Sequence, residues 1–578
     1  MNTRNRVRII LIICTAVIAG WAGNKISYQI RTDLRMGIRL SDIINRVFID
    51  IMNHPLHIST GQYDLLIGLG ISLIALVMMI NQIYKRARRR DGEEHGSSKW
   101  ADPRALRRFM NRKDNTQNLW FASHTALSLD THRTQRNLNA LIIGSAGSGK
   151  TRYYVIPNLA QANTSFVVTD PKGEISAETY DFMRLQGYDV RTLNLIDFAK
   201  SDSYNPLAYF NPEQPEVDCM VLVENLITNT SGKRPTTYSG SDFWEKAERA
   251  LLTALTLYAY YTSEYPTLVE VVDLLAQMKA SETDEASKSY VDHVFDAIYE
   301  TVAEYDADPT SYSEESKRLI DGLRFALSQY NTYTQGAGET KKSVIISLGV
   351  RLAPLHMTQI RRVLSADTIG LDTIGDKKTI LYLIIPDTHA AFNFMAAIFY
   401  EQLFQTLILK ADNSPQRHLD VPVQCFMDEF PNVGRIPAFE RKIAVMRSRG
   451  ISVSVIVQNF AQGKSLYKDD WETIVGNCDS TLFLGGTEES TTKYISGRLG
   501  KQTIITEDHS HSKGRNGSVT HSIRSSARDL MASDEVGRLP THLCIYFLRG
   551  LLPVMDKKMP AISLPRERPS TGAKKRTR

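Results

Sequence analysis

The stretch LIIGSAGSGKTRYYVIPN, residues 141–158, joins a short apolar run to a glycine-rich turn and to residues that can begin a helix. Residues 144–151 fit the pattern G-x-x-x-x-G-K-[ST] of a phosphate-binding loop. In a chain of 578 residues with ordinary glycine, lysine and Ser/Thr usage, a chance match has a probability of about 1 to 2 in 100. The stretch therefore predicts an α/β domain that binds a nucleotide.

Every residue of this loop is a predicted contact of the nucleotide. The set is Gly144, Ser145, Ala146, Gly147, Ser148, Gly149, Lys150 and Thr151. Glycines let the backbone curl so that its N–H groups face phosphate oxygens, and the following helix presents its positive end to the anion. We expect Lys150 to reach the β- and γ-phosphates and the Thr151 hydroxyl to bind Mg²⁺. ATP and Mg²⁺ are the expected cofactors.

An acidic pair, Asp428 and Glu429, ends the apolar run VQCFM. Such a pair is compatible with a simple turn, but a phosphate loop needs an acidic partner on a neighbouring strand. We expect Asp428 to hold the Mg²⁺ shell through water and Glu429 to polarise the attacking water.

Three more polar side chains follow in the sequence. Gln458 ends the strand-like run VSVIVQ, where it either caps the strand or senses the γ-phosphate, as in additional-strand NTPases. Arg447 and Arg449, in RKIAVMRSRG, either belong to a solvated basic helix or reach the nucleotide of a neighbouring subunit. An arginine in the second role accelerates hydrolysis by about 10³–10⁵ in other NTPases.

The arrangement of apolar runs predicts a parallel, doubly wound sheet interrupted by a helical segment. We predict strands within residues 138–144, 165–174, 188–197, 379–386, 421–430, 451–459 and 480–486. Between about residues 205 and 343 no convincing strand pattern is found. Helical periodicity occurs there around residues 243–261, 267–278, 286–305 and 313–330, which predicts an all-α insertion.

The charge of this insertion is unequal. Residues 264–315 hold fourteen acidic residues against two lysines, Lys279 and Lys288. The segment is either a solvated acidic face or a docking surface for a basic partner.

Two apolar runs near the amino end predict a membrane anchor. Residues 9–23 follow three arginines, and residues 65–80 precede the basic cluster KRARRR. Each run is slightly shorter than the ~20 residues that span a bilayer, but flanking residues extend it. The first run alone would also fit a cleavable signal peptide. Because basic clusters stay cytoplasmic, we expect two spans in the cell membrane, with both ends and the main body in the cytoplasm.

Bulk properties add little to these expectations. A net charge of +6 excludes a polycation, and the five widely spaced cysteines show no metal-binding spacing, so we expect reduced thiols and no structural zinc. We divide the chain into a transmembrane hairpin with a short external loop (1–84), a connector (85–135), a nucleotide-binding domain (136–204 and 340–560), the all-α insertion (205–339) and a basic disordered tail (561–578).

Taken together, these motifs resemble the VirD4/TraG type IV coupling proteins, the membrane-anchored ATPases of conjugation and type IV secretion. The resemblance extends over nearly the whole chain and includes GSSKWA, GSAGSGKT, VVTDPKGE, YNPL, FWEKAERALL, MDEFPNVG, RSRGISVSVIVQN and TTKYISGRLG. It implies a RecA-like P-loop NTPase sheet with an all-α insertion domain and a two-helix transmembrane anchor.

The resemblance also implies roles for particular residues and partners. It favours Arg447 over Arg449 as the arginine finger, and it places Asp170 and Lys172 in the DPKGE signature, with a role either in the subunit contact or in the surroundings of the phosphates. Members are thought to act as homo-hexamers that receive a relaxase with its single DNA strand and pass it to the secretion channel. The insertion corresponds to the region held to contact the cargo.

Two other functions fit part of the sequence. A partition-type DNA translocase of the same superfamily would usually carry a DNA-reading winged-helix tail, which this chain has no room for after its last motif. A membrane docking receptor for protein effectors, with hydrolysis regulating assembly, would suit the acidic insertion.

Overall fold

We describe the protein from a computed structural model that places residues 3–38, 40–87, 93–231, 241–280, 288–511 and 519–565. The chain forms two compact units, residues 1–97 with 501–528, and residues 98–500 with 529–578. These units differ from the predicted boundaries, because the connector is divided between them and the insertion shares a unit with the sheet. The predicted disordered tail begins too early, because residues 561–565 are described and Leu564 packs against the core, whereas the tail from residue 566 onward lies outside the described residues.

The larger unit is built on a sheet with nine strands among the described residues. They are β3 (Ala140–Ile143), β4 (Ser165–Asp170), β5 (Asp189–Asn194), β6 (Thr379–Ile384), β7 (Val423–Met427), β8 (Ile451–Val457), β9 (Ser480–Phe483), β12 (Leu543–Leu548) and β13 (Val554–Lys557). The first seven confirm the predicted strands and pair in parallel. The last two, which were not predicted, extend the sheet antiparallel from β9.

The strand order is β13-β12-β9-β3-β8-β7-β4-β6-β5. Along β3, Leu141 and Ile143 pack into the core on one face of the sheet, while Ala140 and Ile142 pack into the core on the other. A parallel sheet is stable in this form because both of its faces are covered. β8 lies between β3 and β7, so an additional strand separates the phosphate loop from the acidic pair.

Helices cover the two faces. Those outside the insertion include η2 (Thr151–Val155), α5 (Ile156–Leu159), α6 (Glu174–Leu185), α14 (Asn393–Asn413), α15 (Phe439–Val445), α16 (Phe460–Tyr467), α17 (Asp470–Gly476), α18 (Glu489–Leu499) and α19 (Ser533–Gly537). The apolar side chains of α14 are almost all buried, which explains why its sequence is apolar on every side.

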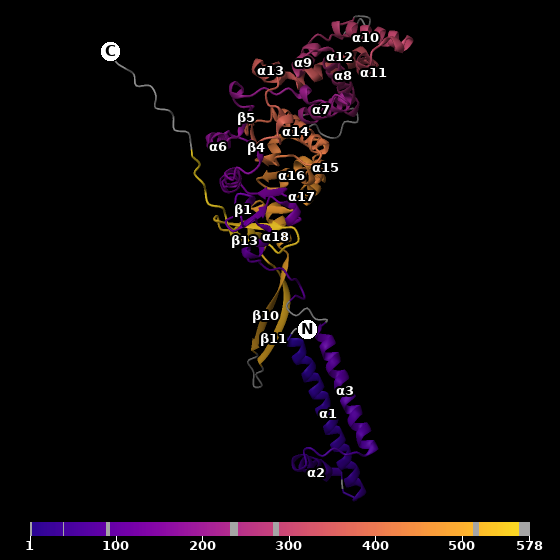
Figure 1. The fold of residues 1–578 in the computed structure, drawn as a ribbon, viewed down its shortest axis with the longest axis vertical. Helices are drawn as coiled ribbons and strands as arrows, with labels where there is room; N and C mark the ends of the chain where they lie inside the picture. Colours follow the sequence, from indigo (N-terminus) through magenta and orange to yellow (C-terminus); the bar gives the residue numbers. More distant parts are fainter. Residues whose placement is uncertain are drawn as a thin grey trace, which may run out of the picture. The chain divides into compact units, whose positions relative to one another are not determined.

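All regular secondary structure in the described residues of the insertion is helical, as predicted. Its helices are α7 (Pro215–Thr230), α8 (Ser241–Thr262), α9 (Leu268–Ala276), α10 (Tyr290–Ala307), α11 (Glu314–Thr334), α12 (Gly338–Arg351) and α13 (Thr358–Leu364). They gather at one end of the larger unit (Figure 1). The buried ion pair between Arg351 of α12 and Glu248 of α8, 3.0 Å apart, ties the insertion together beyond its predicted end at residue 339.

The segment predicted as a polar connector contains folded structure. Its elements are η1 (Pro103–Phe109), β1 (Asn118–Ala122), β2 (Thr125–Ser128) and α4 (Thr131–Thr134). Leu119, Phe121 and Leu127 are buried in the same core as β3. The strands β1 and β2 pair antiparallel. They were not predicted because they are only four or five residues long and lie in a strongly polar stretch of sequence.

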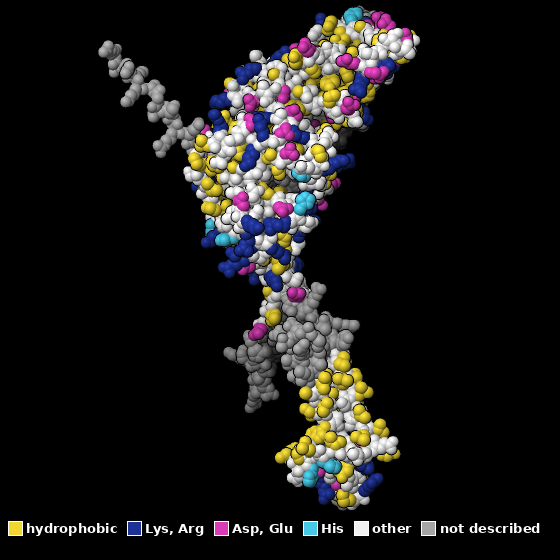
Figure 2. All heavy atoms as spheres, in the orientation of Figure 1, with side chains coloured by type: hydrophobic (Ala, Val, Ile, Leu, Met, Phe, Trp, Pro, Cys, Tyr) yellow, Lys and Arg dark blue, Asp and Glu magenta, His cyan; other side chains and the backbone are white. Residues whose placement is uncertain are grey.

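The smaller unit contains α1 (Thr3–Arg35), α2 (Leu40–Asn53), α3 (Gln62–Ala87) and the hairpin of β10 (Lys501–His511) and β11 (Val519–Asp529). Among the described residues, Gln62–Gln82 is the one helical stretch that is long and apolar enough to cross a membrane. Hydrophobic side chains crowd the surface of the α1 and α3 pair (Figure 2). The first predicted span begins in residues whose side chains lie outside the description, so the two-span anchor stays a prediction.

Basic residues of the predicted external loop make ion pairs inside this unit. Lys25, which is 2% exposed, pairs with Asp50, and Arg46 pairs with Asp33. Arg31 donates to the buried carboxylate of Asp64. These basic residues therefore connect the helices of the unit, while Arg39 lies outside the described residues.

Candidate functional site

The phosphate loop runs from the end of β3 to the beginning of η2, at the carboxyl edge of the sheet. The N–H of Gly144 donates to the carbonyl of Val457 and the N–H of Ser145 to that of Gly485, so the loop is attached to the ends of β8 and β9. Gly147 and Gly149 have φ values of 75° and 86°, a region that favours glycine. The loop thus has the tight curl that the sequence predicts.

Lys150 and Thr151 are both engaged within the chain. The Lys150 ammonium is 7% exposed, donates to the Gly144 carbonyl at 2.9 Å and lies 3.5 Å from Glu429 Oε1. The Thr151 hydroxyl donates to Asp428 Oδ2 at 2.6 Å. The structure therefore brings together Lys150, Thr151 and both acids of the pair, Asp428 and Glu429.

Asp428 lies at the end of β7 and is 4% exposed. Burial raises the pKa of this carboxyl to about 6, although the Thr151 hydroxyl and the Lys150 charge act in the opposite direction. A buried carboxylate beside a hydroxyl and an ammonium is a suitable oxygen ligand for Mg²⁺, which would displace the proton.

Glu429 adopts a left-handed backbone conformation, with φ 53° and ψ 50°. For a residue other than glycine this costs roughly 1–3 kcal/mol, and such strain is typical of functional sites. The Gln458 amide donates to both carboxylate oxygens of Glu429 at 3.0 Å. The sequence left open whether Gln458 caps its strand; the structure places it on the acidic pair, because β8 lies directly between β3 and β7.

These residues line one cleft of about 550 Å³. Asp387, Asn432 and Gln462 line it too and were not predicted. Asp387 lies three residues after the end of the buried strand β6, so the rule that locates Asp428 after β7 could have found it.

The DPKGE signature takes two different positions in this cleft. Asp170 is buried and accepts a hydrogen bond from the N–H of Ser176 at 2.7 Å, so it caps the first turn of α6. Lys172 is exposed at the rim, 3.9 Å from Asp387.

Arg447 lies away from this cleft. It belongs to η9 (Arg447–Arg449), immediately before β8, and therefore lies at the amino edge of the sheet, opposite the phosphate loop. Its guanidinium donates to the Thr131 carbonyl at 3.0 Å. Arg449, by contrast, makes two hydrogen bonds to Asp412, at 2.9 and 2.8 Å. Arg447 cannot serve the nucleotide of its own subunit from this position.

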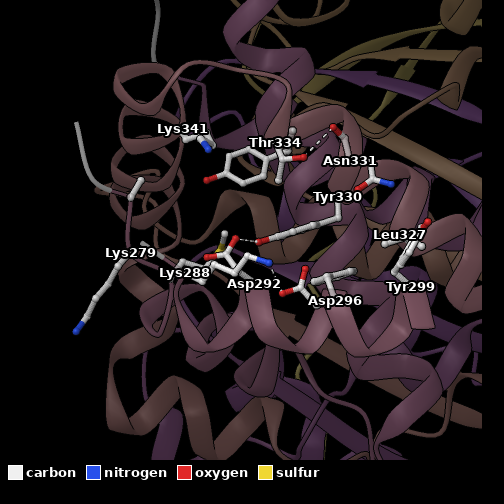
Figure 3. Close-up of a pocket in the computed structure, with 14 residues that line it drawn as sticks. Lys279, Lys288, Asp292, Asp296, Tyr299, Leu327, Tyr330, Asn331, Thr334 and Lys341 are labelled. Carbon is white, nitrogen blue, oxygen red and sulfur yellow. Dashed lines mark hydrogen bonds and ion pairs between the residues drawn. The ribbon is translucent and has the colours of Figure 1, made fainter. Parts of the chain in front are cut away.

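A second cavity, of about 380 Å³, lies in the insertion (Figure 3). The rings of Phe295 and Tyr330 stack in its wall with centroids 3.9 Å apart, and the Tyr330 hydroxyl donates to Asp292 at 2.5 Å. Lys288 pairs with Asp296 at 2.6 Å, while Lys279 points outward in Figure 3. The cavity wall is thus held by pairing within the insertion, and acids that the sequence offered for docking take part in it.

Residues 100–560 match the profile of a protein family described as "Type IV secretory system Conjugative DNA transfer". The chain is 22% identical to Protein VirD4 of Agrobacterium fabrum over 524 residues, which covers 87% of this chain and 71% of VirD4. It is also 22% identical to the conjugal transfer protein TraG of Escherichia coli over 479 residues, covering 77% of this chain and 71% of TraG.

Solved structures of the plasmid coupling protein TrwB have a similar fold. The unbound form of TrwBdeltaN70 gives a TM-score of 0.53 at 14% identity, covering 83% of this chain and 97% of that one. TrwB in complex with ADP and Mg²⁺ gives 0.52 at 14% identity, covering 82% and 95%. At this identity the similarity establishes the shared fold.

Proposed function

Because the chain belongs to the type IV secretory system conjugative DNA transfer family, and is a coupling protein of conjugation, we propose that it hydrolyses ATP to drive delivery of its cargo. The observation that carries this proposal is the meeting of Lys150, Thr151, Asp428, Glu429 and Gln458 in one cleft. All five lie inside the segment that matches the family.

The side chains of the cleft suit a bound Mg²⁺ and ATP. Thr151 and Asp428 would hold the ion, whose charge neutralises the phosphate oxygens, and TrwB has been solved with ADP and Mg²⁺. Lys150 would leave the Gly144 carbonyl to contact the phosphates. Glu429 would accept the proton of the attacking water, while the Gln458 amide fixes the orientation of its carboxylate.

We further propose that the chain acts as a ring, in which Arg447 of one subunit completes the site of the next. Its place at the amino edge of the sheet supports this proposal, as does the pairing of Arg449 with Asp412. The number of subunits in such a ring would be six, as the family resemblance implies.

The proposed cargo is a relaxase with its single DNA strand, passed to the channel of the secretion system. The apolar stretch Gln62–Gln82 supports an anchor in the cell membrane, with a second span in α1 and the nucleotide-binding body in the cytoplasm. Sequence-independent phosphate contacts suffice for moving DNA, so a base-reading element is not required.

Substituting Lys150 by alanine tests the central claim. The variant is expected to insert in the membrane normally and to lose DNA transfer altogether, because it removes the phosphate-binding ammonium. Lys464→Ala, which changes an exposed lysine of α16, is the matched control and should transfer normally. Normal transfer by Lys150→Ala, measured by mating with membrane fractionation in parallel, would remove ATP hydrolysis from the function.

Replacing Glu429 by glutamine separates binding from hydrolysis. The amide keeps the shape of the side chain, so nucleotide binding should persist while the ATPase rate falls by about 10²–10⁴, the contribution of a general base. An unchanged rate would assign the base to another residue.

A further inference from the structure

After β13, the chain returns to the phosphate loop. Beyond β13, residues 558–564 form an extended segment, here called the C-terminal strap, along the beginning of η2. The Lys558 ammonium donates to the Ser148 carbonyl at 2.8 Å and lies 5.8 Å from the centre of the Tyr153 ring. A lysine at the far end of the sequence therefore contacts the loop that begins the site.

Contacts at both ends hold the strap in place. Lys558 is 9% exposed, its N–H donates to the His542 carbonyl at 2.9 Å, and its own carbonyl accepts from the Ser123 hydroxyl at 2.7 Å. At the other end, Leu564 packs against the core that contains β3 and β12. Burial lowers the pKa of Lys558, because the charged ammonium loses hydration that surface lysines keep.

Between these anchors, the strap forms one wall of another cleft, of about 540 Å³, which is separate from the cavity in the insertion. Ala561, Ile562 and Ser563 line it from the strap, and Ile156 and Glu178 line it from the opposite side. Thr151, Arg152 and Glu174 line both this cleft and the phosphate cleft, so the two clefts adjoin at the residues that follow the loop lysine.

We propose that the C-terminal strap forms the wall of a nucleoside subsite, which receives the base and ribose of the nucleotide whose phosphates lie on the loop. This inference rests on the proposed nucleotide function. The side chains that line this cleft fit a nucleoside. Ile156 and Ile562 offer apolar surface to the face of a base. Glu174 and Glu178, one turn apart on α6, offer carboxylates to ribose hydroxyls. Arg152 offers donors to the edge of the base or to a phosphate oxygen.

Two truncations of the full-length chain test the strap. One ends at Lys558 and removes the cleft wall but keeps the lysine; the control ends at Pro565 and keeps the whole strap. Affinities for Mg²⁺-ATP and for Mg²⁺-tripolyphosphate, which has the phosphates without the nucleoside, are measured on the purified proteins. The chain that ends at Lys558 is expected to lose roughly tenfold in ATP affinity and to bind tripolyphosphate as the control does.

The point variant Ile562→Ala should shift the two affinities in the same selective way, by roughly threefold. Retained tripolyphosphate binding shows that a variant is folded around its loop. Equal ATP affinity in both truncations, or equal losses for the two ligands, would overturn the nucleoside subsite. Failure of the intact chain to bind either ligand would instead contradict the proposed nucleotide function.

Discussion

The nucleotide cleft and the all-α insertion use their charged side chains in opposite ways. In the cleft, Lys150, Asp428 and Glu429 face one another across a hollow, and their contacts are those that a nucleotide and Mg²⁺ would replace. In the insertion, many acids are committed to structure. Asp273 accepts two hydrogen bonds from Arg361, and Asp306 accepts two from Arg324.

This difference shows what a charge pattern says about function. Asp292 accepts hydrogen bonds from the Ser289 and Tyr330 hydroxyls, and Asp296 pairs with Lys288, so the negative charge of both is already engaged within the insertion. Three more of the fourteen acids, Glu282, Asp284 and Glu285, lie outside the described residues. An excess of acids in the sequence therefore overstates the negative charge that a basic partner would meet.

The largest expected effect concerns Arg447, the proposed arginine finger, which its own chain holds away from the cleft. Arg447→Ala should lower the ATPase rate by about 10³–10⁵ if the side chain completes the neighbouring site. Mixing this variant with Glu429→Gln subunits should restore part of the rate, because some interfaces of the mixed ring then hold an intact arginine and an intact base.

Arg449→Ala is the matched control, since Arg449 lies two residues away and pairs with Asp412. It should leave the catalytic rate of folded protein close to normal. If Arg447→Ala hydrolyses ATP at the wild-type rate, the cleft is complete within one chain and the ring is not needed for catalysis.

Short motifs at strand ends predicted the cleft because parallel strands bring their carboxyl ends to one edge. The seven parallel strands, the phosphate loop and the acidic pair follow from local sequence for that reason. The contact between Gln458 and Glu429 depends on β8 lying between β3 and β7, an order that no local pattern encodes. β12 pairs with β9 more than 60 positions earlier, β13 joins the sheet only through β12, and Lys558 contacts the loop from 410 positions away, so all three were missed.

The next effect tests whether charge in the insertion is structural. Arg351 and Glu248 form an ion pair with side chains 6% and 2% exposed. Arg351→Ala should lower the free energy of unfolding by about 3–5 kcal/mol, because it leaves a buried carboxylate without its partner. The double variant Arg351→Met/Glu248→Gln should recover most of this loss in a chemical denaturation experiment. Equal stability of the single variant and the wild type would show that the pair is dispensable.

A pH titration tests whether Asp428 belongs to the Mg²⁺ site of the nucleotide cleft. Since burial raises the pKa of Asp428 to about 6, affinity for Mg²⁺ with nucleotide should fall toward tenfold per pH unit below pH 6 and level off above it. The free energy of unfolding has the opposite pH dependence. Because the pKa of Asp428 is higher in the folded than in the unfolded state, this group favours folding at low pH, and its contribution is lost as pH rises through 6. Parallel titration of Mg²⁺-ATP in buffer corrects for protons on the nucleotide, and affinity that is flat from pH 5 to 7 would place Asp428 outside the metal site.

The smallest expected effect decides whether any acids of the insertion remain for the cargo. Glu300 and Glu304 are exposed one turn apart on α10, and neither side chain bonds to another residue that the structure describes. Reversing both to lysine should lower DNA transfer by roughly three- to tenfold without changing the ATPase rate, because exposed ion pairs contribute little individually. Lys279→Glu, at the rim of the insertion cavity, serves as the control of opposite sign and should not impair transfer of a basic cargo. If Lys279→Glu loses transfer and the reversal of Glu300 and Glu304 does not, the cargo meets the insertion cavity rather than the acidic helix, and the partner presents anionic groups.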